Sequence, residues 1–250
     1  MKKLVVLIPC YNEEKGIGNV IDNIPIESLN SFGYEVEILV IDNNSKDKTS
    51  EVAKEHGANV IFEEKQGKGN AVRKGFNHIK KADIIVMIDG DLTYNPKEMI
   101  RIIEPIDSGF CNVVIGSRLC GRINGGMSKF NRLGNWFFSF MVRLAYNENV
   151  TDVCTGYFAW NHKVIKELKK HLTSEGFSLE MEMLTKMSKM GYDIFAVPIS
   201  YDNRMGQSTL RPAKDGYRIM KTWVKYLTWK PYKHLNHFSM RIFINIDLEN

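Results

Sequence analysis

Long hydrophobic runs are missing from this sequence of 250 residues. No stretch approaches the roughly 18 consecutive apolar residues that a helix needs to cross a bilayer. The first apolar run, from Leu4 to Ile8, has the length of a strand and meets Pro9, so we expect no signal peptide. The sequence therefore predicts no transmembrane helix, and any contact with a membrane would be made from its surface.

Paired cysteines and strong net charge are missing as well. Cys10, Cys111, Cys120 and Cys154 contain no Cys-x-x-Cys pair, so neither a zinc site nor a disulfide framework is indicated, and a reducing compartment is favoured. The net charge of +5 is modest; it suits an acidic ligand or an anionic membrane surface, and we expect no nucleic-acid partner. The hydrophobic share of 44% is ordinary for a globular protein with a core.

Short apolar segments alternate with amphipathic ones along the chain, which predicts βαβ units and a mostly parallel sheet flanked by helices. Asn12 and Ser45 are expected helix N-caps, the Gly-rich segment 119–129 is expected to form a loop, and Pro198 favours an edge position for the last strand. We expect strands at 4–8, 35–41, 59–62, 86–88, 112–115, 155–160 and 193–197, and helices at 66–79, 131–146, 177–190 and 213–229.

Polar residues collect where successive predicted strands end. Because open α/β folds bind ligands at the carboxyl edge of the sheet, this repetition predicts one site built from several strand ends. The central strand stops at Asp89-Gly90-Asp91, which offers two hard oxygen donors suited to Mg²⁺ or Mn²⁺, although these residues alone are equally compatible with an empty turn. The other strand-end residues are Tyr11, Glu13, Asp42 and Arg118.

Eight motifs in register resemble the family 2 glycosyltransferases, and more narrowly the branch that makes dolichyl- or polyprenyl-phosphate sugars. The resemblance runs from residue 4 to about residue 220. The motifs are Pro9-x-Tyr11-Asn12-Glu13-Glu14, Asp42-Asn43-Asn44-Ser45, Gly67-Lys68-Gly69, Asp89-x-Asp91, Gly116-Ser117-Arg118, Asn131-Arg132-Leu133-Gly134-Asn135, Thr155-Gly156-Tyr157 and Arg204-x-Gly206-x-Ser208.

The resemblance implies a GT-A fold, an α/β architecture related to the Rossmann fold, with acceptor-side helices in the C-terminal half. It implies one domain over residues 1–230, divided into a nucleotide-sugar half (1–118) and an acceptor half (119–230), followed by a tail (231–250). Asp89 and Asp91 would hold the metal and, with Arg204, act in catalysis. Arg118, Arg132 and Glu182 would face the acceptor's lipid phosphate. The nucleotide sugar would be bound by Pro9, Tyr11, Glu13, Val40, Asp42, Lys68, Gly90, Thr93, Ser208 and Arg211.

A missing motif bears on the acceptor. Many relatives that glycosylate a hydroxyl carry a Glu-Asp pair and an Arg-Trp motif, and this sequence has neither dipeptide. A hydroxyl needs a base, whereas a phosphomonoester is mostly dianionic at neutral pH because its second pKa is about 6. We therefore expect a phosphate acceptor, no protein base, and a single displacement that inverts the anomeric carbon.

The donor is less constrained. Thr209 replaces the Lys that often follows Ser208 in relatives, so Arg211 is expected to supply that charge, and Asn43-Asn44 departs from the usual residues after Asp42. The remaining motifs favour UDP-glucose or UDP-N-acetylglucosamine over GDP-mannose. The alternatives are a glycosyltransferase acting on a soluble saccharide or small alcohol, with Glu180 or Glu182 as base, and a non-catalytic domain that binds nucleotide sugar.

A lipid acceptor implies a peripheral position at the cytoplasmic face of the membrane. The helix at 131–146, the helix at 213–229 or the tail would then contact the bilayer. An aromatic helix such as 131–146 is, however, more often part of a core. The sequence leaves the oligomeric state open.

Overall fold

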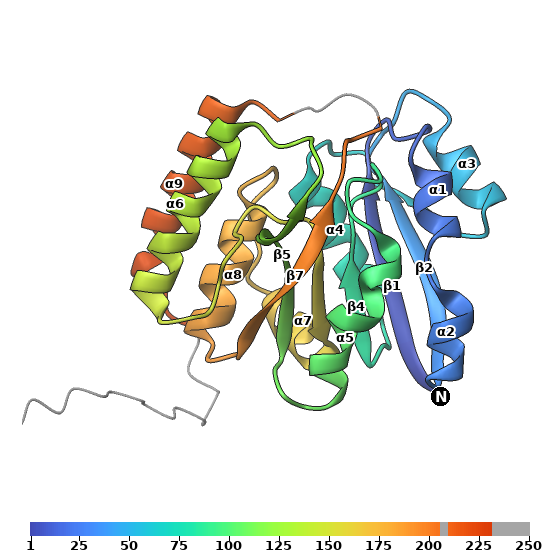
Figure 1. The fold of residues 1–250 in the computed structure, drawn as a ribbon, viewed down its shortest axis with the longest axis horizontal. Coiled ribbons are helices and arrows are strands. Elements are labelled where there is room, and N and C mark those ends of the chain that lie inside the picture. The colour runs from blue at the N-terminus through green and yellow to red at the C-terminus, as the bar shows by residue number, and fades with distance from the viewer. Residues whose placement is uncertain (206–209, 232–250) are drawn as a thin grey trace, which may run out of the picture.

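The computed structural model describes residues 1–205 and 210–231, and these form a seven-stranded mixed sheet flanked by helices (Figure 1). The strand order is β3-β2-β1-β4-β6-β5-β7, with β6 antiparallel to both of its neighbours. The strands are β1 (Lys2–Cys10), β2 (Tyr34–Asp42), β3 (Asn59–Phe62), β4 (Ile84–Met87), β5 (Val113–Ile123), β6 (Phe158–Asn161) and β7 (Ile194–Tyr201).

Alternating apolar residues on the central strands bury both faces of the sheet. Val5 and Leu7 of β1 face one core, and Leu4, Val6 and Ile8 face the other, as the two-residue period of a strand requires. The described helices that cover the first core are α4 (Lys68–His78), α6 (Lys129–Tyr146), α7 (His162–Leu168), α8 (Leu179–Lys189) and α9 (Pro212–Leu227). The second core is covered by α1 (Ile17–Asp22), α2 (Ile26–Ser31), α3 (Thr49–Glu55) and α5 (Met99–Asp107). A short 3₁₀ turn (Pro96–Glu98) precedes α5.

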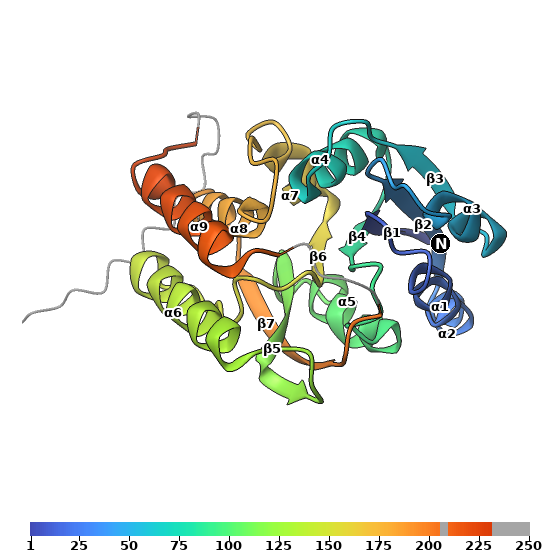
Figure 2. The same ribbon diagram turned by 90° about the horizontal axis from the view of Figure 1, so that it is seen from above.

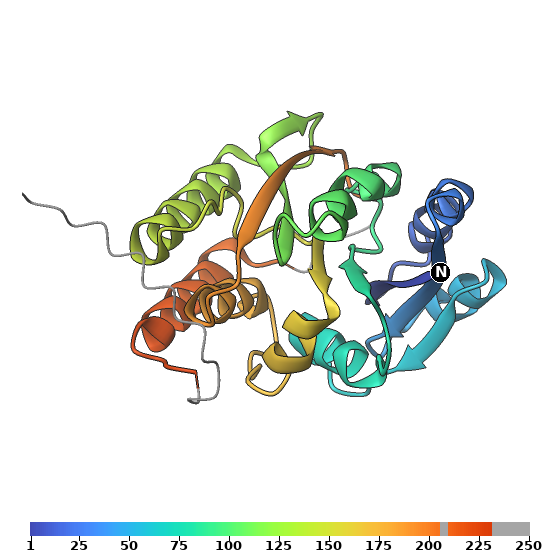
Figure 3. The ribbon, with the colours of Figure 1, turned by 90° about the horizontal axis from the view of Figure 1, so that it is seen from below.

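The mostly parallel sheet and the predicted elements are confirmed, with shifts of a few residues at their ends. The edge position predicted for the last strand is also confirmed, since β7 pairs with β5 alone among the described strands. Figure 2 looks onto the edge at which β1 and β2 end, and Figure 3 shows the N-terminus at the opposite edge. Among the described residues, no helix combines the length and apolar character needed to cross a bilayer.

Three local predictions are wrong. Asn12 does not cap a helix, because its φ is 56° and α1 starts only at Ile17. Ser45 does not cap α3; Asp47 accepts the backbone N–H of Thr49 at that helix start. The predicted loop at 119–129 is strand β5 as far as Ile123, since a register shift carries the ladder past Gly121. A Cβ on Gly121 would lie 1.9 Å from the carbonyl oxygen of Ile199, so glycine marks close strand contact here.

Candidate active site

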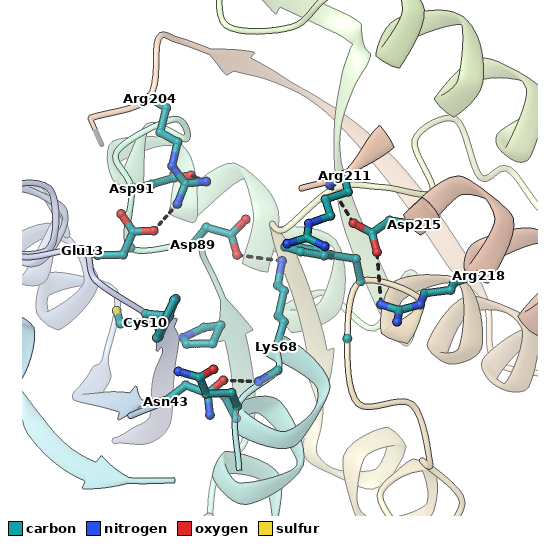
Figure 4. A pocket seen from close by; sticks show the side chains of 18 of the residues that line it. Cys10, Glu13, Asn43, Lys68, Asp89, Asp91, Arg204, Arg211, Asp215 and Arg218 are labelled. Carbon is teal, nitrogen blue, oxygen red and sulfur yellow. Dashed lines mark hydrogen bonds and ion pairs between the residues drawn. The ribbon is translucent and has the colours of Figure 1, made fainter. Parts of the chain in front are cut away.

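A cavity of about 430 Å³ opens at the carboxyl edge of the sheet, where β1, β2 and β4 end. Charged side chains of both signs line it: the carboxylates of Glu13, Asp89 and Asp91 gather at the strand ends, and most of the cations come from α9 and the segment before it, as Figure 4 shows. This charge pattern suits a ligand that carries a bound metal cation toward the carboxylates and contacts the positively charged side chains itself. The predicted residues that line it are Pro9, Tyr11, Glu13, Lys68, Asp89, Gly90, Asp91, Arg204 and Arg211.

Backbone hydrogen bonds between two strand-end loops hold Tyr11 and Glu13 in place. The Asn12 N–H donates to Ser45 Oγ at 3.0 Å, and the Glu13 N–H donates to Thr49 Oγ1 at 2.8 Å. Asn12 Oδ1 in turn accepts the N–H of Lys46 at 2.7 Å. Asn12 and Ser45 therefore join the ends of β1 and β2 instead of capping helices.

Arg204 bridges two carboxylates of the strand side. Its Nη2 donates to Glu13 Oε1, and its Nη1 lies 3.0 Å from Asp91 Oδ2. Burial raises the pKa of Glu13 to about 8, although Arg204 opposes this shift, and burial also raises the pKa of Asp91. Among the described residues, Glu13 Oε2 and Arg204 Nε are buried without a hydrogen-bond partner. Buried polar atoms are normally paired, so these two atoms mark a place for a polar ligand.

Lys68 lies between two further carboxylates. Its Nζ is 2.8 Å from Asp89 Oδ1 and 2.8 Å from Glu180 Oε1. Burial opposes its charge, but the two carboxylates outweigh burial and raise the pKa of Lys68. The motif Gly67-Lys68-Gly69 acquires a steric explanation, because a Cβ on Gly67 or Gly69 would lie 2.2 or 2.1 Å from a backbone carbonyl of the segment before α8. Two glycines allow that segment to approach Lys68.

Gly156 of the Thr155-Gly156-Tyr157 motif supports Asp89 in the same way. A Cβ at this position would lie 2.1 Å from Asp89 Oδ2. The Gly156 N–H donates to Tyr94 Oη at 2.7 Å, which fixes the backbone against the carboxylate. The glycine of this motif therefore leaves room for the side chain of Asp89, and residues 155–157 line neither of the cavities described here.

A second cavity of about 330 Å³ adjoins the first and extends between α6 and α9. Apolar residues of α6 and α9 form much of its wall, and the predicted residues that line it are Lys68, Asp89, Asp91, Thr93, Arg118 and Arg204. Arg118 is buried and makes a fork with Asp152, with its Nε and Nη2 at 2.8 and 2.7 Å from the two carboxylate oxygens. Its Nη1 makes no hydrogen bond among the described residues, so it is available to a ligand.

Several predicted residues do not reach either cavity. Val40 is buried in the core between β2 and its helices, and Asp42 accepts hydrogen bonds from the Ser45 N–H and Ser50 Oγ. Glu182 has no exposed side-chain surface, and its carboxylate is bound by Thr173, Ser174 and Lys186, which corrects the acceptor role predicted for it. Arg132 is exposed on α6 outside both cavities, and Ser208 lies outside the described residues.

Other residues of the site were not predicted. Asn43 accepts the Gly67 N–H and donates to the Lys65 carbonyl, both at 2.6 Å, and so positions the loop before Lys68. Its place directly after Asp42 was the available signal. Lys214 and Arg218 line the first cavity from α9, and their spacing of one helical turn could have indicated this. Asp152 carries no local signal for its role, and Glu180 was named only as a possible base in the alternative with a hydroxyl acceptor.

The donor set fits a divalent cation that takes most of its ligands from a bound substrate. Among the described residues, no three His, Cys, Asp or Glu side chains form a metal-binding cluster. Mg²⁺ is nevertheless commonly held by one or two carboxylates together with substrate phosphates and water. Asp91 and Glu13 already bind the cationic guanidinium of Arg204, and Glu13 Oε2 has no partner, so this cluster accepts positive charge.

Solved structures share this fold. Glucosyl-3-phosphoglycerate synthase from Mycobacterium tuberculosis, in complex with Mn²⁺, UDP and phosphoglyceric acid, superposes with a TM-score of 0.70 over 91% of this chain and 79% of that chain. The sequence identity of 21% limits that likeness to the fold, which is the GT-A fold. The predicted fold class is thereby confirmed.

Sequence comparison goes further. Glycosyltransferase AglJ of Haloferax volcanii is 32% identical over 87% of this chain and 72% of its own length. The dolichyl-phosphate hexose transferase of the same organism is 31% identical over 89% of this chain and 92% of its own length. The model of "Glycosyl transferase family 2" matches residues 5–169, which include Asp89, Asp91 and Lys68. The chain therefore belongs to glycosyl transferase family 2.

Proposed function

We propose that this glycosyltransferase moves one sugar from a nucleoside-diphosphate sugar to the phosphate of a dolichyl or other polyprenyl lipid. The observation that carries the proposal is the meeting of two cavities at Asp89, Asp91 and Arg204: the first has further cations on α9, and the second runs along apolar residues of α6 and α9 and contains the buried Arg118. We assign the donor role to residues 1–118 together with Arg204 and Arg211, which line the same cavity, and the acceptor role mainly to the rest of residues 119–230. The similarity to a dolichyl-phosphate hexose transferase supports the acceptor class.

On the donor side, Tyr11 and Glu13 would bind the nucleoside, and the Glu13 Oε2 atom that lacks a partner among the described residues would accept a hydrogen bond from one of its hydroxyl groups. Arg204 and Arg211 would bind the diphosphate, since guanidinium groups match phosphate oxygens in charge and geometry. Asp91, with Asp89 beside it, would hold Mg²⁺ or Mn²⁺. When bound, the divalent cation neutralises charge on the departing nucleoside diphosphate.

On the acceptor side, Arg118 would donate from Nη1 to a phosphate oxygen of the lipid while Asp152 keeps the guanidinium fixed. The lipid chain would leave the site along the apolar wall between α6 and α9. A phosphate dianion attacks the anomeric carbon without a protein base, in line with the departing diphosphate. The sugar would therefore be transferred with inversion.

An extraction assay tests acceptor and donor together. Purified protein is incubated with Mg²⁺ or Mn²⁺, with dolichyl or undecaprenyl phosphate, and with labelled UDP-glucose, UDP-N-acetylglucosamine or GDP-mannose. We expect label in the organic phase, from a UDP-sugar in preference to GDP-mannose. Label that stays in water with every lipid, but appears on an added saccharide, would contradict the lipid acceptor and favour a hydroxyl acceptor.

The outer face of α6 supports a position at the membrane surface. An apolar stripe with three- and four-residue spacing lies exposed along it, and Trp136 stacks on Phe140 with ring centroids 5.9 Å apart. The expectation that this helix is mainly a core element is thus only half right, because Asn135, Ser139 and Val142 are buried while the stripe is not. The exposed residues of this stripe are Phe130, Leu133, Trp136, Phe137, Phe140 and Leu144.

Charge around the stripe matches an anionic lipid surface. Residues 119–147 contain Arg122, Lys129, Arg132 and Arg143 but no Asp or Glu. Helix α9, which lies beside α6 in Figures 1 and 2, adds exposed Lys and Arg residues. A second copy of this chain would bring like charges together, whereas anionic lipid head groups would neutralise them.

Replacing Trp136 and Phe140 together with Glu is expected to weaken binding to vesicles of anionic phospholipid by at least about tenfold, since exposed aromatic side chains supply the buried apolar area. Cosedimentation of protein with the vesicles measures this. The matched control replaces Phe32 and Phe110 with Glu; these side chains are more exposed than Trp136 and Phe140 but lie outside α6, and the variant should bind like the wild type. Equal loss in both variants would contradict the assignment of α6.

A further inference from the structure

The two cavities share a small set of residues at the point where they meet. Lys68, Asp89, Asp91 and Arg204 line both of them, together with Phe177 and Asp215. Under the proposed function, the nucleotide lies in the first cavity and the acceptor phosphate in the second. The transferred sugar must then lie at this junction, because its anomeric carbon is bonded to one substrate and attacked by the other.

Glu180 approaches the junction from α8 and is nearly buried, with 6% of its side chain exposed. It lines the second cavity, and its Oε1 lies 2.8 Å from Lys68 Nζ, which also contacts Asp89. Its place in the first turn of α8 stabilises a carboxylate through the helix dipole. One ammonium group therefore orients two carboxylates from different elements toward one space.

The charges of this triad do not cancel. Lys68 balances one of the two carboxylates, which leaves one negative charge in a place with little water. Carboxylates are strong acceptors for hydroxyl protons, and an ammonium group is a donor to hydroxyl oxygens. An array of this kind suits a neutral polyol, whereas a negatively charged group placed beside it would be repelled.

A purely structural ion pair explains the triad less well. A buried pair that only joins two elements needs a single carboxylate, and solvent access is of no use to it. Here Asp89 retains 24% of its side-chain exposure and Lys68 retains 14%, both on the cavity side. Glu182, two residues further along α8, is the structural counterpart, because it has no exposed side-chain surface and lines neither cavity.

We propose that Glu180, held by Lys68 against Asp89, is a specificity-determining residue that accepts hydrogen bonds from hydroxyl groups of the donor sugar. The inference rests on the proposed function, since it requires a nucleotide sugar in the first cavity. It assigns Glu180 to the neutral sugar of the donor, not to the nucleotide and not to the acceptor. It further implies that a donor with an acidic sugar is rejected.

Calorimetric titration separates the sugar contribution from the nucleotide contribution. Wild-type protein and Glu180→Gln are titrated, with Mn²⁺ present, with UDP-glucose and UDP and with GDP-mannose and GDP. We expect Glu180→Gln to bind the nucleotide sugar roughly 10- to 100-fold more weakly, the loss typical of a hydrogen bond to a charged group. Binding of the free nucleoside diphosphate should be unchanged, which also shows that the variant is folded.

A competing role as catalytic base predicts a different result. Glu180→Gln would then lower kcat while the binding of nucleotide sugar stayed the same. Selectivity gives a second readout: wild-type protein should discriminate against UDP-glucuronate relative to UDP-glucose, and the variant should lose about tenfold of that discrimination. Glu180→Asp, which keeps the charge, should recover part of both properties.

Glu175→Gln is the matched control, because it makes the same chemical change just before α8 on a side chain that is 66% exposed. It should behave as the wild type in every titration. Equal weakening of nucleotide sugar and free nucleotide by Glu180→Gln, or no weakening of either, would overturn the inference alone. Wild-type protein that binds none of the four nucleotides would overturn the proposed function, and this inference with it.

Discussion

Replacing Asp91 with Asn is expected to lower kcat about 10²- to 10³-fold, the usual loss when one preorganised electrostatic group is removed from a reaction centre. Asp91 is 4% exposed, so its charge acts through little solvent. The fold should survive, because the hydrogen bonds from the Thr93 N–H and Oγ1 to Asp91 Oδ1 can be made to an amide oxygen. The measurement is steady-state transfer in saturating Mn²⁺ or Mg²⁺.

Thermal stability separates this loss from unfolding. Burial, together with the charge of Asp89, raises the pKa of Asp91, so ionised Asp91 destabilises the folded state and Asp91→Asn should melt no lower than the wild type. Asp22→Asn is the control, since Asp22 is exposed on α1 and pairs with His56. Unchanged turnover of Asp91→Asn at saturating metal would contradict both the metal role and the charge role.

Arg204 contacts the carboxylate on which that prediction depends. Its guanidinium lies between Glu13 and Asp91 and pairs with both, so one cation balances two buried carboxylates. The unpaired Arg204 Nε then indicates which part of this side chain is still available to a phosphate oxygen.

Much of this site could be predicted because strand ends are local features of the sequence. Asp89 and Asp91 follow an apolar run directly, and Tyr11 and Glu13 follow another, so alternation and sheet topology place them at one edge. Gly67 and Gly69 are local features as well, but the segment whose close approach requires them lies about a hundred residues later in the sequence. Its identity depends on the tertiary fold.

The wrong predictions for Asn12, Ser45 and Glu182 also arise because the contacts of these residues depend on the tertiary fold. Asn12 and Ser45 are residue types that often cap helices, but here Ser45 Oγ accepts the Asn12 N–H and Asn12 Oδ1 accepts the Lys46 N–H, between loops that lie far apart in the sequence. Glu180 and Glu182 stand two residues apart on one helix, where a 100° turn per residue separates their directions widely. Which of the two faced the cavity could not follow from spacing alone, because it depends on how α8 packs against α4 and α9.

Glu182→Ala is expected to cost about 3–5 kcal/mol of unfolding free energy, as when one partner of a buried ion pair is removed. The side chain of Glu182 is fully buried, and that of Lys186, one turn later, is 2% exposed. Lys186 Nζ also donates to the His171 carbonyl and lies 4.0 Å from the Tyr226 ring centroid. A Lys186 ammonium group without its carboxylate partner would therefore weaken the packing of α9 against α8. Thermal melting should fall by roughly 10 °C.

An exposed pair gives the control for this prediction. Glu167→Ala removes a contact between Glu167 on α7 and Lys170 just after it, and should cost less than about 1 kcal/mol because surface pairs contribute little. The double variant Glu182→Leu with Lys186→Met removes both charges and should recover most of the stability that Glu182→Ala loses. Equal melting temperatures for the two single variants would contradict a structural role for Glu182.

The dependence on pH follows from the direction of the Glu182 shift. Burial alone would raise its pKa, but hydrogen bonds from Lys186 and Ser174 outweigh burial and lower it below the ordinary 4.5. A lowered folded-state pKa means that the carboxylate stabilises the fold above pH 4.5 and loses this effect as the pH falls through the folded value. The stability difference between wild type and Glu182→Ala, measured by denaturant unfolding, should therefore be constant near neutral pH and shrink in acid.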